Sequence, residues 1–260
     1  MTAEREWDAA KYHAVSEPQL AWGERVLARL DLRGDEIAVD AGCGTGRVTA
    51  RLAGRLPRGR TIGVDRSLAM AVSAGVTLAE LPADVVAADL LALPLASSSA
   101  DVVFSTAVFH WIKDHDALFT EIGRVLRRGG ALHAQCGGAG NISRAHGFAK
   151  EVAGLPEFAN AFEGWEDPWN YATPEETEAR LASAGFAPAH AWLDPAPTPF
   201  PTAAACAEFA GPVILRTWLS RLPSDDRRAR FVDAVVERIG RVDPEHTLDY
   251  VRLNIEAVRG

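Results

Sequence analysis

The 260 residues carry a net charge of −8, from 35 acidic residues against 27 lysines and arginines. Because no basic cluster offsets this charge, nucleic acid is excluded as a favoured partner. An apolar content of 48% with 24% charged residues excludes a disordered chain, and no run of 18 apolar residues predicts a membrane span.

The cysteines and the amino terminus indicate where the protein resides. Three scattered cysteines without a CxxC spacing, Cys43, Cys136 and Cys206, argue against a disulfide framework and against a zinc site. The charged start MTAEREWDAAKYH lacks the apolar stretch of a signal peptide. We therefore expect a soluble cytoplasmic protein that needs no metal.

Short β-rich segments alternate with helical ones in the first half of the chain. Strands are predicted at 36–42, 60–65, 84–89, 101–106 and 131–137, with helices near 47–56, 67–80 and 115–127. The last helix is expected to end at Gly129 and Gly130, because glycine is common after a helix. This alternation predicts a parallel sheet wrapped by helices.

The regular alternation lapses after residue 138. Residues 138–172 mix glycine, proline and aromatic residues, which predicts loops and short helices over a site. A helix is expected to begin after Thr173, with Pro174 first, Glu176 completing a capping box and Gly185 ending it. A strand at 189–194, an apolar helix at 203–222 and a last strand within 247–260 complete the list.

These elements predict one α/β domain over residues 1–260. We expect a doubly wound, Rossmann-like, seven-stranded sheet that is mostly parallel and carries an antiparallel edge strand. Its parts are an amino-terminal lid (1–30), a cofactor-binding core (36–137) and a helical substrate cap (138–172 and 196–225).

Three glycines follow the first predicted strand in VDAGCGTG. The third glycine comes one residue too early for the GxGxxG fingerprint of dinucleotide sites, so a nicotinamide oxidoreductase fits poorly. Asp40, Asp65 and Asp89 end the first three strands, and the carboxyl ends of neighbouring parallel strands line one crevice. Three carboxylates there favour a positively charged ligand with free ribose hydroxyls.

With these residues the sequence resembles the class I S-adenosylmethionine-dependent methyltransferases. The segments VDAGCGTG, GVD, AADL, DVVFSTAVFHWI and RVLRRGGAL are similar to the motifs of that family in their order. The resemblance implies S-adenosylmethionine as the cofactor. It also implies its contacts: Asp40 and the backbone of Gly42, Gly44 and Gly46 at the methionine end, Asp65 and Arg66 at the ribose, Asp89 and Leu90 at the adenine, and Ser105 with Thr106 beside the methyl group.

Within the family the amino-terminal segment, FHWI and YATPEETEARLASAGF resemble small-molecule enzymes of the trans-aconitate and juvenile-hormone-acid methyltransferase type. The resemblance implies O-methylation of a carboxylic acid, with Gln19 and Trp111 facing the acceptor carboxylate. Trp7, Tyr12 and Trp22 would belong to the lid. In the capping regions Trp165, Trp169, Tyr171 and Trp218, with Arg144 and Arg216, would suit an organic anion.

His110 follows the fourth strand, where a catalytic base could act. A carboxylic acid is already ionised at pH 7, so we expect His110 to position the substrate rather than to take a proton. Helix packing of Trp7 and Trp22, methylation of an O, N or C atom of a secondary metabolite, and a cofactor-binding protein without catalysis remain open alternatives. The oligomeric state is open too.

Overall fold

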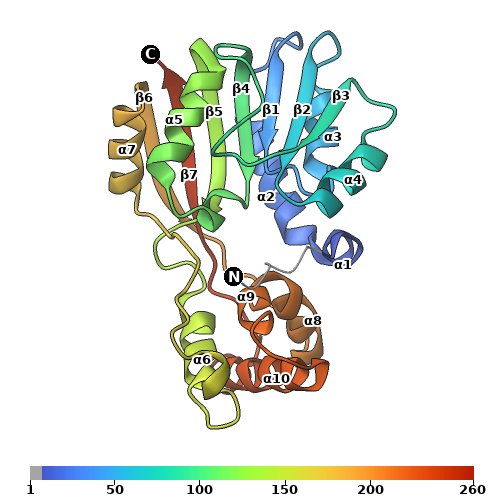
Figure 1. Cartoon of the computed structure of the whole chain (residues 1–260), viewed down its shortest axis with the longest axis vertical. Coiled ribbons are helices and arrows are strands. Elements are labelled where there is room, and N and C mark those ends of the chain that lie inside the picture. Colours follow the sequence, from blue (N-terminus) through green and yellow to red (C-terminus); the bar gives the residue numbers. More distant parts are fainter. Residues whose placement is uncertain (1–7) are drawn as a thin grey trace. The chain divides into compact units, whose positions relative to one another are not determined.

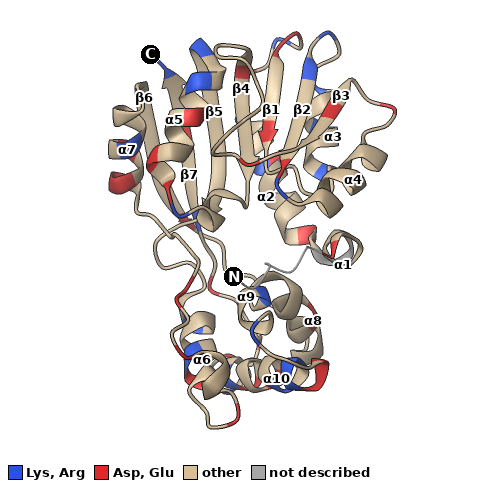
Figure 2. Ribbon diagram, in the orientation of Figure 1, with Lys and Arg blue, Asp and Glu red and all other residues tan. Residues whose placement is uncertain are grey.

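The computed structural model describes residues 8–260, which divide into two compact units. The sheet unit contains residues 8–139, 169–194 and 252–260, and the helical unit contains residues 140–168 and 195–251. Figure 1 labels the helices and strands of both units. Acidic and basic residues are interspersed along both units (Figure 2).

Strands of the sheet unit form one sheet in the order β3-β2-β1-β4-β5-β7-β6. They are β1 (Ile37–Ala41), β2 (Arg60–Asp65), β3 (Ala83–Ala87), β4 (Ala100–Thr106), β5 (Leu126–Gly137), β6 (Phe186–Pro195) and β7 (Val251–Arg259). The pairs β3-β2, β2-β1, β1-β4 and β4-β5 are parallel, and β5-β7 is antiparallel. The predicted mostly parallel, seven-stranded sheet is confirmed, and its antiparallel strand β7 lies between β5 and β6.

Helices cover both faces of this sheet, as a doubly wound fold requires. The helices of this unit are α1 (Ala9–Val15), α2 (Glu17–Ala28), α3 (Arg47–Gly54), α4 (Leu68–Thr77), η1 (Phe109–Trp111), α5 (His115–Val125) and α7 (Pro174–Ser183). Successive strand residues point to opposite faces. Val39 of β1 therefore packs in the cluster that includes Phe119 of α5, whereas Ala38 packs with Val26 of α2 and Leu52 of α3.

The capping box of α7 is confirmed, because Thr173 Oγ1 accepts from the Glu176 amide at 3.2 Å and Glu176 Oε2 accepts from the Thr173 amide at 3.1 Å. The predicted end of the preceding helix at Gly129 and Gly130 is wrong. Helix α5 ends at Val125, and both glycines lie in β5, where the pairing with β4 shifts register between Ala100 and Val102. The glycines serve this irregularity in the strand, not a helix cap.

The helical unit contains α6 (Ser143–Ala153), η2 (Ala159–Ala161), α8 (Ala203–Val213), α9 (Arg216–Leu219) and α10 (Asp225–Val242). The single helix predicted at 203–222 is wrong, because the chain breaks into α8 and α9 just after Pro212, which has no amide hydrogen to donate. Helix α10 has no counterpart among the predicted elements. It packs against α6 and α8 (Figure 1), so this unit extends beyond the predicted cap segments.

None of the helices within residues 8–260 combines the length and the apolar character that a membrane crossing requires.

Candidate active site

The turn between β1 and α3 exposes its backbone. Gly42, Gly44 and Gly46 have φ angles of 89°, 53° and 83°, in the left-handed region that favours glycine. A Cβ on Gly42 would lie 2.2 Å from a Val108 methyl group, so a side chain there is excluded, whereas a Cβ on Gly44 would meet nothing nearer than Tyr12 at 4.0 Å. The turn thus offers a ligand bare backbone with open space above Gly44.

Two carboxylates flank this turn. Asp40, at the end of β1, is buried and accepts a 2.6 Å hydrogen bond from Thr49 Oγ1. Burial, aided by the charge of Asp65, raises the pKa of Asp40 to about 7. Asp65, at the end of β2, accepts from the Gly44 amide through Oδ2 and from the Ser67 amide through Oδ1, both at 2.9 Å. Each of its oxygens can accept further hydrogen bonds, and Arg66 beside it is exposed.

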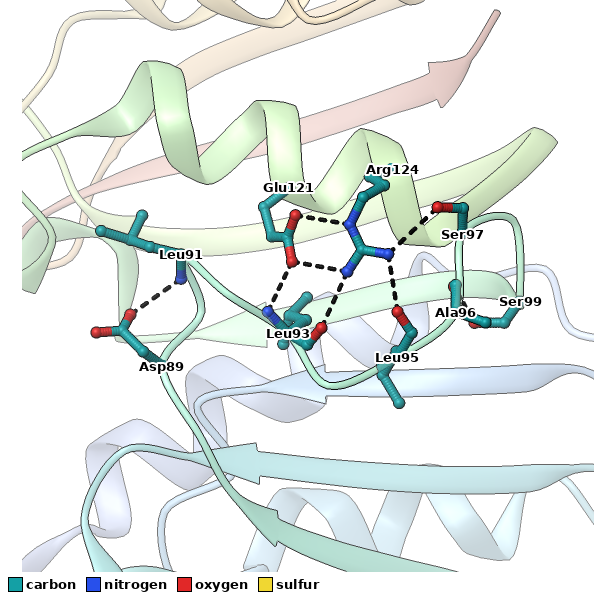
Figure 3. Close-up of polar contacts among 9 residues, drawn as sticks. All are labelled: Asp89, Leu91, Leu93, Leu95, Ala96, Ser97, Ser99, Glu121 and Arg124. Atoms are coloured by element: carbon teal, nitrogen blue, oxygen red, sulfur yellow. Dashed lines mark hydrogen bonds and ion pairs between the residues drawn. The ribbon is translucent and has the colours of Figure 1, made fainter.

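The loop after β3 carries Asp89 and Leu90 and is held by two residues of α5 (Figure 3). Glu121 Oε1 accepts from the Leu93 amide at 2.6 Å. Arg124 donates to the Leu93 and Leu95 carbonyls at 2.9 and 2.8 Å and pairs with Glu121 at 2.7 Å. At the start of the loop Asp89 Oδ1 accepts from the Leu91 amide. The ion pair between Arg124 and Glu121, which we call the loop clamp, fixes the loop to α5.

A cavity of about 50 Å³ lies at the ends of β1 and β4, where its lining includes Tyr12, Gln19, Asp40, Gly44 and Thr106. Gln19 Oε1 is buried and accepts no hydrogen bond from the described residues. Burial, with the nearby charge of Asp65, raises the pKa of Tyr12 to about 12. Pockets for small molecules usually hold roughly 300–1,000 Å³, so a ligand the size of a nucleoside needs α1 to move.

Polar contacts hold α1 and the start of α2 against the glycine turn. His13 Nδ1 and Thr45 Oγ1 are 3.0 Å apart, and Arg47 pairs with Glu17 at 2.8 Å. Glu17 is mostly exposed, and such pairs contribute little to stability. The Arg47–Glu17 pair therefore contributes little to holding this segment, and the Arg47 bonds to the His13 carbonyl and to Ser16 Oγ add to it.

Four aromatic rings of the sheet unit meet beyond β4. His110 stacks on Trp169 and Tyr171 with ring centroids 5.5 and 5.8 Å apart, and Trp111 lies 3.8 Å from Trp169. His110 Nδ1 accepts a 3.2 Å hydrogen bond from the Gly137 amide. A ring nitrogen that accepts carries no proton, so the proton of the neutral ring lies on Nε2. His110 can therefore donate a hydrogen bond from Nε2, but neither of its ring nitrogens is arranged to take a proton.

The structure brings most of the predicted cofactor residues to the carboxyl ends of the strands. Asp40, the three glycines and Asp65 surround one turn, while Asp89 and Leu90 follow β3. Ser105 is buried and donates to the Ala41 carbonyl at 2.6 Å. Its hydroxyl therefore ties β4 to β1, and of the two residues that end β4, Thr106 lines the cavity.

The predicted acceptor residues divide between the two units. Tyr12, Gln19 and Trp22 belong to the sheet unit, and Trp7 lies outside the described residues. Arg144 and Arg216 belong to the helical unit, where Arg144 pairs with Asp243 at 3.1 Å and donates to the Thr247 carbonyl. The predicted aromatic residues divide as well. Trp169 and Tyr171 belong to the sheet unit, whereas Trp165 and Trp218 belong to the helical unit, with their ring centroids 4.2 Å apart.

Arg252 was not among the predicted site residues. It is 2% exposed, and its guanidinium carbon lies 4.3 Å from the ring centroid of Trp22. The sequence feature that could have drawn attention to Arg252 is an arginine inside the otherwise largely apolar segment YVRLNIEAV.

Comparison with known proteins shows the family to which the chain is similar. The model of the methyltransferase domain matches residues 39–134. The chain is 30% identical to a trans-aconitate 2-methyltransferase of Deinococcus radiodurans over 87% of each chain. It is 37% identical to one of Azoarcus sp. (strain BH72) over half of each chain.

Among solved structures, the chain is similar to a Haemonchus contortus phosphoethanolamine N-methyltransferase 2 in complex with S-adenosyl-L-methionine. The TM-score is 0.62 at 17% identity, over 96% of this chain and 56% of that one. The bare glycine turn and the two carboxylates fit a cationic cofactor that carries a ribose. The chain belongs to the class I S-adenosylmethionine-dependent methyltransferases, in the group that includes the trans-aconitate 2-methyltransferases.

Proposed function

We propose that this methyltransferase transfers the methyl group to a carboxylate oxygen of a small organic acid. The observation that carries the proposal is the hydrogen bond from the Gly137 amide to His110 Nδ1. Because the proton of His110 then lies on Nε2, the histidine is arranged to donate a hydrogen bond rather than to take a proton. An acceptor that is ionised at pH 7 needs no base, and a carboxylic acid meets this condition. The trans-aconitate 2-methyltransferase names of the relatives support the same substrate class.

The cofactor supplies, when bound, a methyl group on a positively charged sulfur. Asp65 accepts hydrogen bonds from the ribose hydroxyls, and Asp40 lies beside the ammonium group at the methionine end. Asp89 and the Leu90 amide hold the adenine edge. These roles give three separate carboxylates three separate contacts, in the order of the strands β1, β2 and β3.

The acceptor lies near the end of β4, between the cavity and the aromatic rings. Trp111 forms a wall, Gln19 contributes its amide, and His110 donates from Nε2 to an acceptor oxygen. Fixing the nucleophile at attack distance from the methyl group accounts for most of the rate acceleration in such a displacement. Excluding water from this apolar wall also strengthens the hydrogen bonds that orient the acid.

The test uses S-adenosylmethionine that is labelled in its methyl group. The protein is incubated with panels of acids, phenols and amines, and the products are treated with mild base. A methyl ester releases its label as methanol, whereas an aryl ether or a methylamine retains it. Label that resists base, or transfer to phenols or amines alone, would show that the acceptor class is wrong. Tight binding of the cofactor without any transfer would favour a protein without catalysis.

A further inference from the structure

A second cavity lies within the helical unit and takes no part in the transfer proposed above. Its volume is about 680 Å³, within the roughly 300–1,000 Å³ that pockets for small molecules usually hold. Its lining comes from residues 150–167 and from Trp218, which belong to one compact unit. The side chains that line it include Lys150, Phe162, Glu163, Trp165, Asp167 and Trp218.

Five aromatic rings pack together at this cavity. Phe158 meets Phe231 of α10 edge to face, with ring centroids 5.3 Å apart, and Phe162 lies 5.5 Å from Trp218 of α9. Trp165 lies 4.2 Å from Trp218. Phe158, Phe231 and Trp218 are at most 2% exposed, whereas Phe162 and Trp165 are only partly buried. The buried rings therefore support the two outer rings, whose remaining surface lines the cavity.

A tight turn at Gly164 sets the angle between the two outer rings. Gly164 has a φ angle of 67°, in the left-handed region that favours glycine. The Trp165 amide donates to the Phe162 carbonyl at 3.0 Å across this turn. The ring centroids of Phe162 and Trp165 are 5.8 Å apart, with 73° between the ring planes. The turn thus forms two aromatic walls of the cavity.

The charge at this cavity is mainly negative. The segment LPEFANAFEGWEDP, residues 155–168, contains four acidic residues and no lysine or arginine. Of the lining residues, Glu163 is exposed, and Asp167 lies 3.9 Å from the ammonium group of Lys150. Aromatic ring faces carry partial negative charge and attract cations. Two carboxylates and two ring faces against one ammonium group favour a cationic ligand.

The indole N–H of Trp218 has no acceptor within the described residues. Trp218 is 1% exposed and lines the cavity. Buried donors in native proteins almost always have a partner, and a ligand in the cavity can supply one through an oxygen atom. This donor indicates an occupant independently of the charges.

From these features we propose that the helical unit binds a small organic ammonium ion that also carries a hydroxyl group. Phe162 and Trp165 contact the ammonium group, Glu163 and Asp167 balance its charge, and the hydroxyl oxygen accepts from Trp218. A quaternary ammonium nitrogen has no lone pair, so it cannot accept a methyl group. The proposal therefore goes beyond the methyl transfer and does not depend on the acceptor class.

The test compares choline with two relatives that each lack one feature. Choline is titrated into the full chain saturated with S-adenosylhomocysteine, which occupies the carboxylates at the glycine turn, and NMR follows its trimethylammonium signal. Its uncharged isostere 3,3-dimethylbutan-1-ol should bind at least about threefold more weakly, because it lacks the cation. Tetramethylammonium, which lacks the hydroxyl, should bind about three- to tenfold more weakly.

Substitutions at the cavity should change the affinity for choline in opposite directions. Trp165→Leu should weaken binding by about 3- to 30-fold, the value of a cation–π contact. Glu163→Gln should weaken it by about two- to fivefold, as for an exposed ion pair. Lys150→Met should strengthen it by a similar factor, because the lysine no longer competes for Asp167. A site for an anion would respond to Glu163→Gln and Lys150→Met with the opposite signs.

Phe200→Leu and Glu157→Gln are the matched controls in the same unit. The ring of Phe200 lies 5.0 Å from that of Phe209, and Glu157 pairs with Arg230 at 2.7 Å, but none of these four residues lines the cavity. Both variants should bind choline as the wild type does.

Three results would overturn the proposal: no binding of choline by the wild type, equal affinity for choline and its uncharged isostere, or unchanged affinity in Trp165→Leu. Should Trp165→Leu fail to fold, Glu163→Gln and Lys150→Met decide, since both alter exposed side chains. Shifts of the same sign in these two variants, or no shift in either, would then count against the site.

Discussion

The carboxylate of Asp65 accepts a 2.9 Å hydrogen bond from the backbone amide of Gly44. The acid that ends β2 and the glycine turn after β1 therefore form one unit, although 21 residues separate them. Its second oxygen binds the Ser67 amide at the start of α4. Any change at Asp65 therefore alters both the proposed ribose contact and the shape of the turn.

Asp65→Ala should remove most of the stabilisation that S-adenosylhomocysteine gives. Loss of hydrogen bonds to a charged acceptor costs about 1.5–3 kcal/mol, which corresponds to roughly 10- to 150-fold in affinity. Calorimetry measures the affinity for S-adenosylhomocysteine, and the shift in Tm on adding it measures the stabilisation. Asp84→Ala is the control, since Asp84 belongs to an exposed pair with Arg60 on the edge of the sheet. An unchanged affinity in Asp65→Ala would refute the ribose contact.

The pKa of Asp40 should make the unliganded protein less stable as pH rises. In the native state this pKa is raised to about 7, against about 3.9 in an unfolded chain. Between these values the native state binds more protons than the unfolded state, so the free energy of unfolding falls with increasing pH and levels off above pH 7. The Tm of the wild type, measured relative to that of Asp40→Asn, should therefore fall from pH 5 to pH 8.

Asp84→Asn provides the control for this pH effect. Its hydrogen bond to Arg60 lowers the pKa of Asp84, so its contribution is lost only in acid, as pH falls through the lowered pKa. Its Tm difference from the wild type should stay constant between pH 5 and pH 8. If the Asp40→Asn difference is constant too, the carboxyl of Asp40 is not perturbed as described.

Arg124→Met should weaken recognition of adenine without removing a ligand contact. The loop clamp fixes the segment that begins with Asp89 (Figure 3), so its loss should loosen the Asp89 carboxylate. We expect the preference for S-adenosylhomocysteine over S-inosylhomocysteine, which lacks the adenine amino group, to fall about three- to tenfold, the value of one net hydrogen bond.

Arg127→Met is the control for the loop clamp, because Arg127 pairs with Asp101 at 2.8 Å in the neighbouring strands. It should lose a similar amount of stability and keep the preference between the two nucleosides. A preference that survives in Arg124→Met would mean that the loop keeps its conformation without the clamp.

His110→Asn should lower kcat by less than the roughly 100-fold that loss of a general base costs at minimum. The rate of the wild type should stay flat between pH 6 and pH 8, since a carboxylate acceptor is fully ionised there. Initial rates at saturating cofactor over this pH range provide the measurement. A thousandfold loss at unchanged cofactor affinity, with a wild-type rate that rises through a histidine-like pKa, would contradict the carboxylate assignment.

Local patterns in the sequence predicted most of the sheet and the places of Asp40 and Asp65 at the carboxyl ends of two strands. The strands that carry Asp40 and Asp65 at their carboxyl ends are short, apolar and bounded by turn residues, so their ends could be located from the sequence. The loop clamp could not, because Leu93 and Glu121 are 28 residues apart and no spacing rule joins them. Arg252 was missed for a related reason: its environment comes from Trp22 and Gly137, which the fold alone brings to it.

The two glycines of β5 were assigned wrongly because tertiary pairing overrode the local signal, whereas helix α10 was missed although its signal is local. Gly129 and Gly130 have the composition of a helix end, yet pairing with β4 draws the chain into the sheet directly after Val125. Helix α10 does carry a helical pattern, with Phe231, Val235 and Ile239 buried on one face. That pattern could have been recognised from the sequence.

Because the cavity under Tyr12 is small, the apparent affinity of this protein for its cofactor depends on the equilibrium between closed and open positions of α1. With about 50 Å³ available, molecules in the described conformation are closed to the cofactor, and the apparent Kd equals the intrinsic Kd divided by the fraction that is open. A substitution that weakens the hold of α1 on the glycine turn, such as Thr45→Val against His13, would tighten apparent binding without adding a contact.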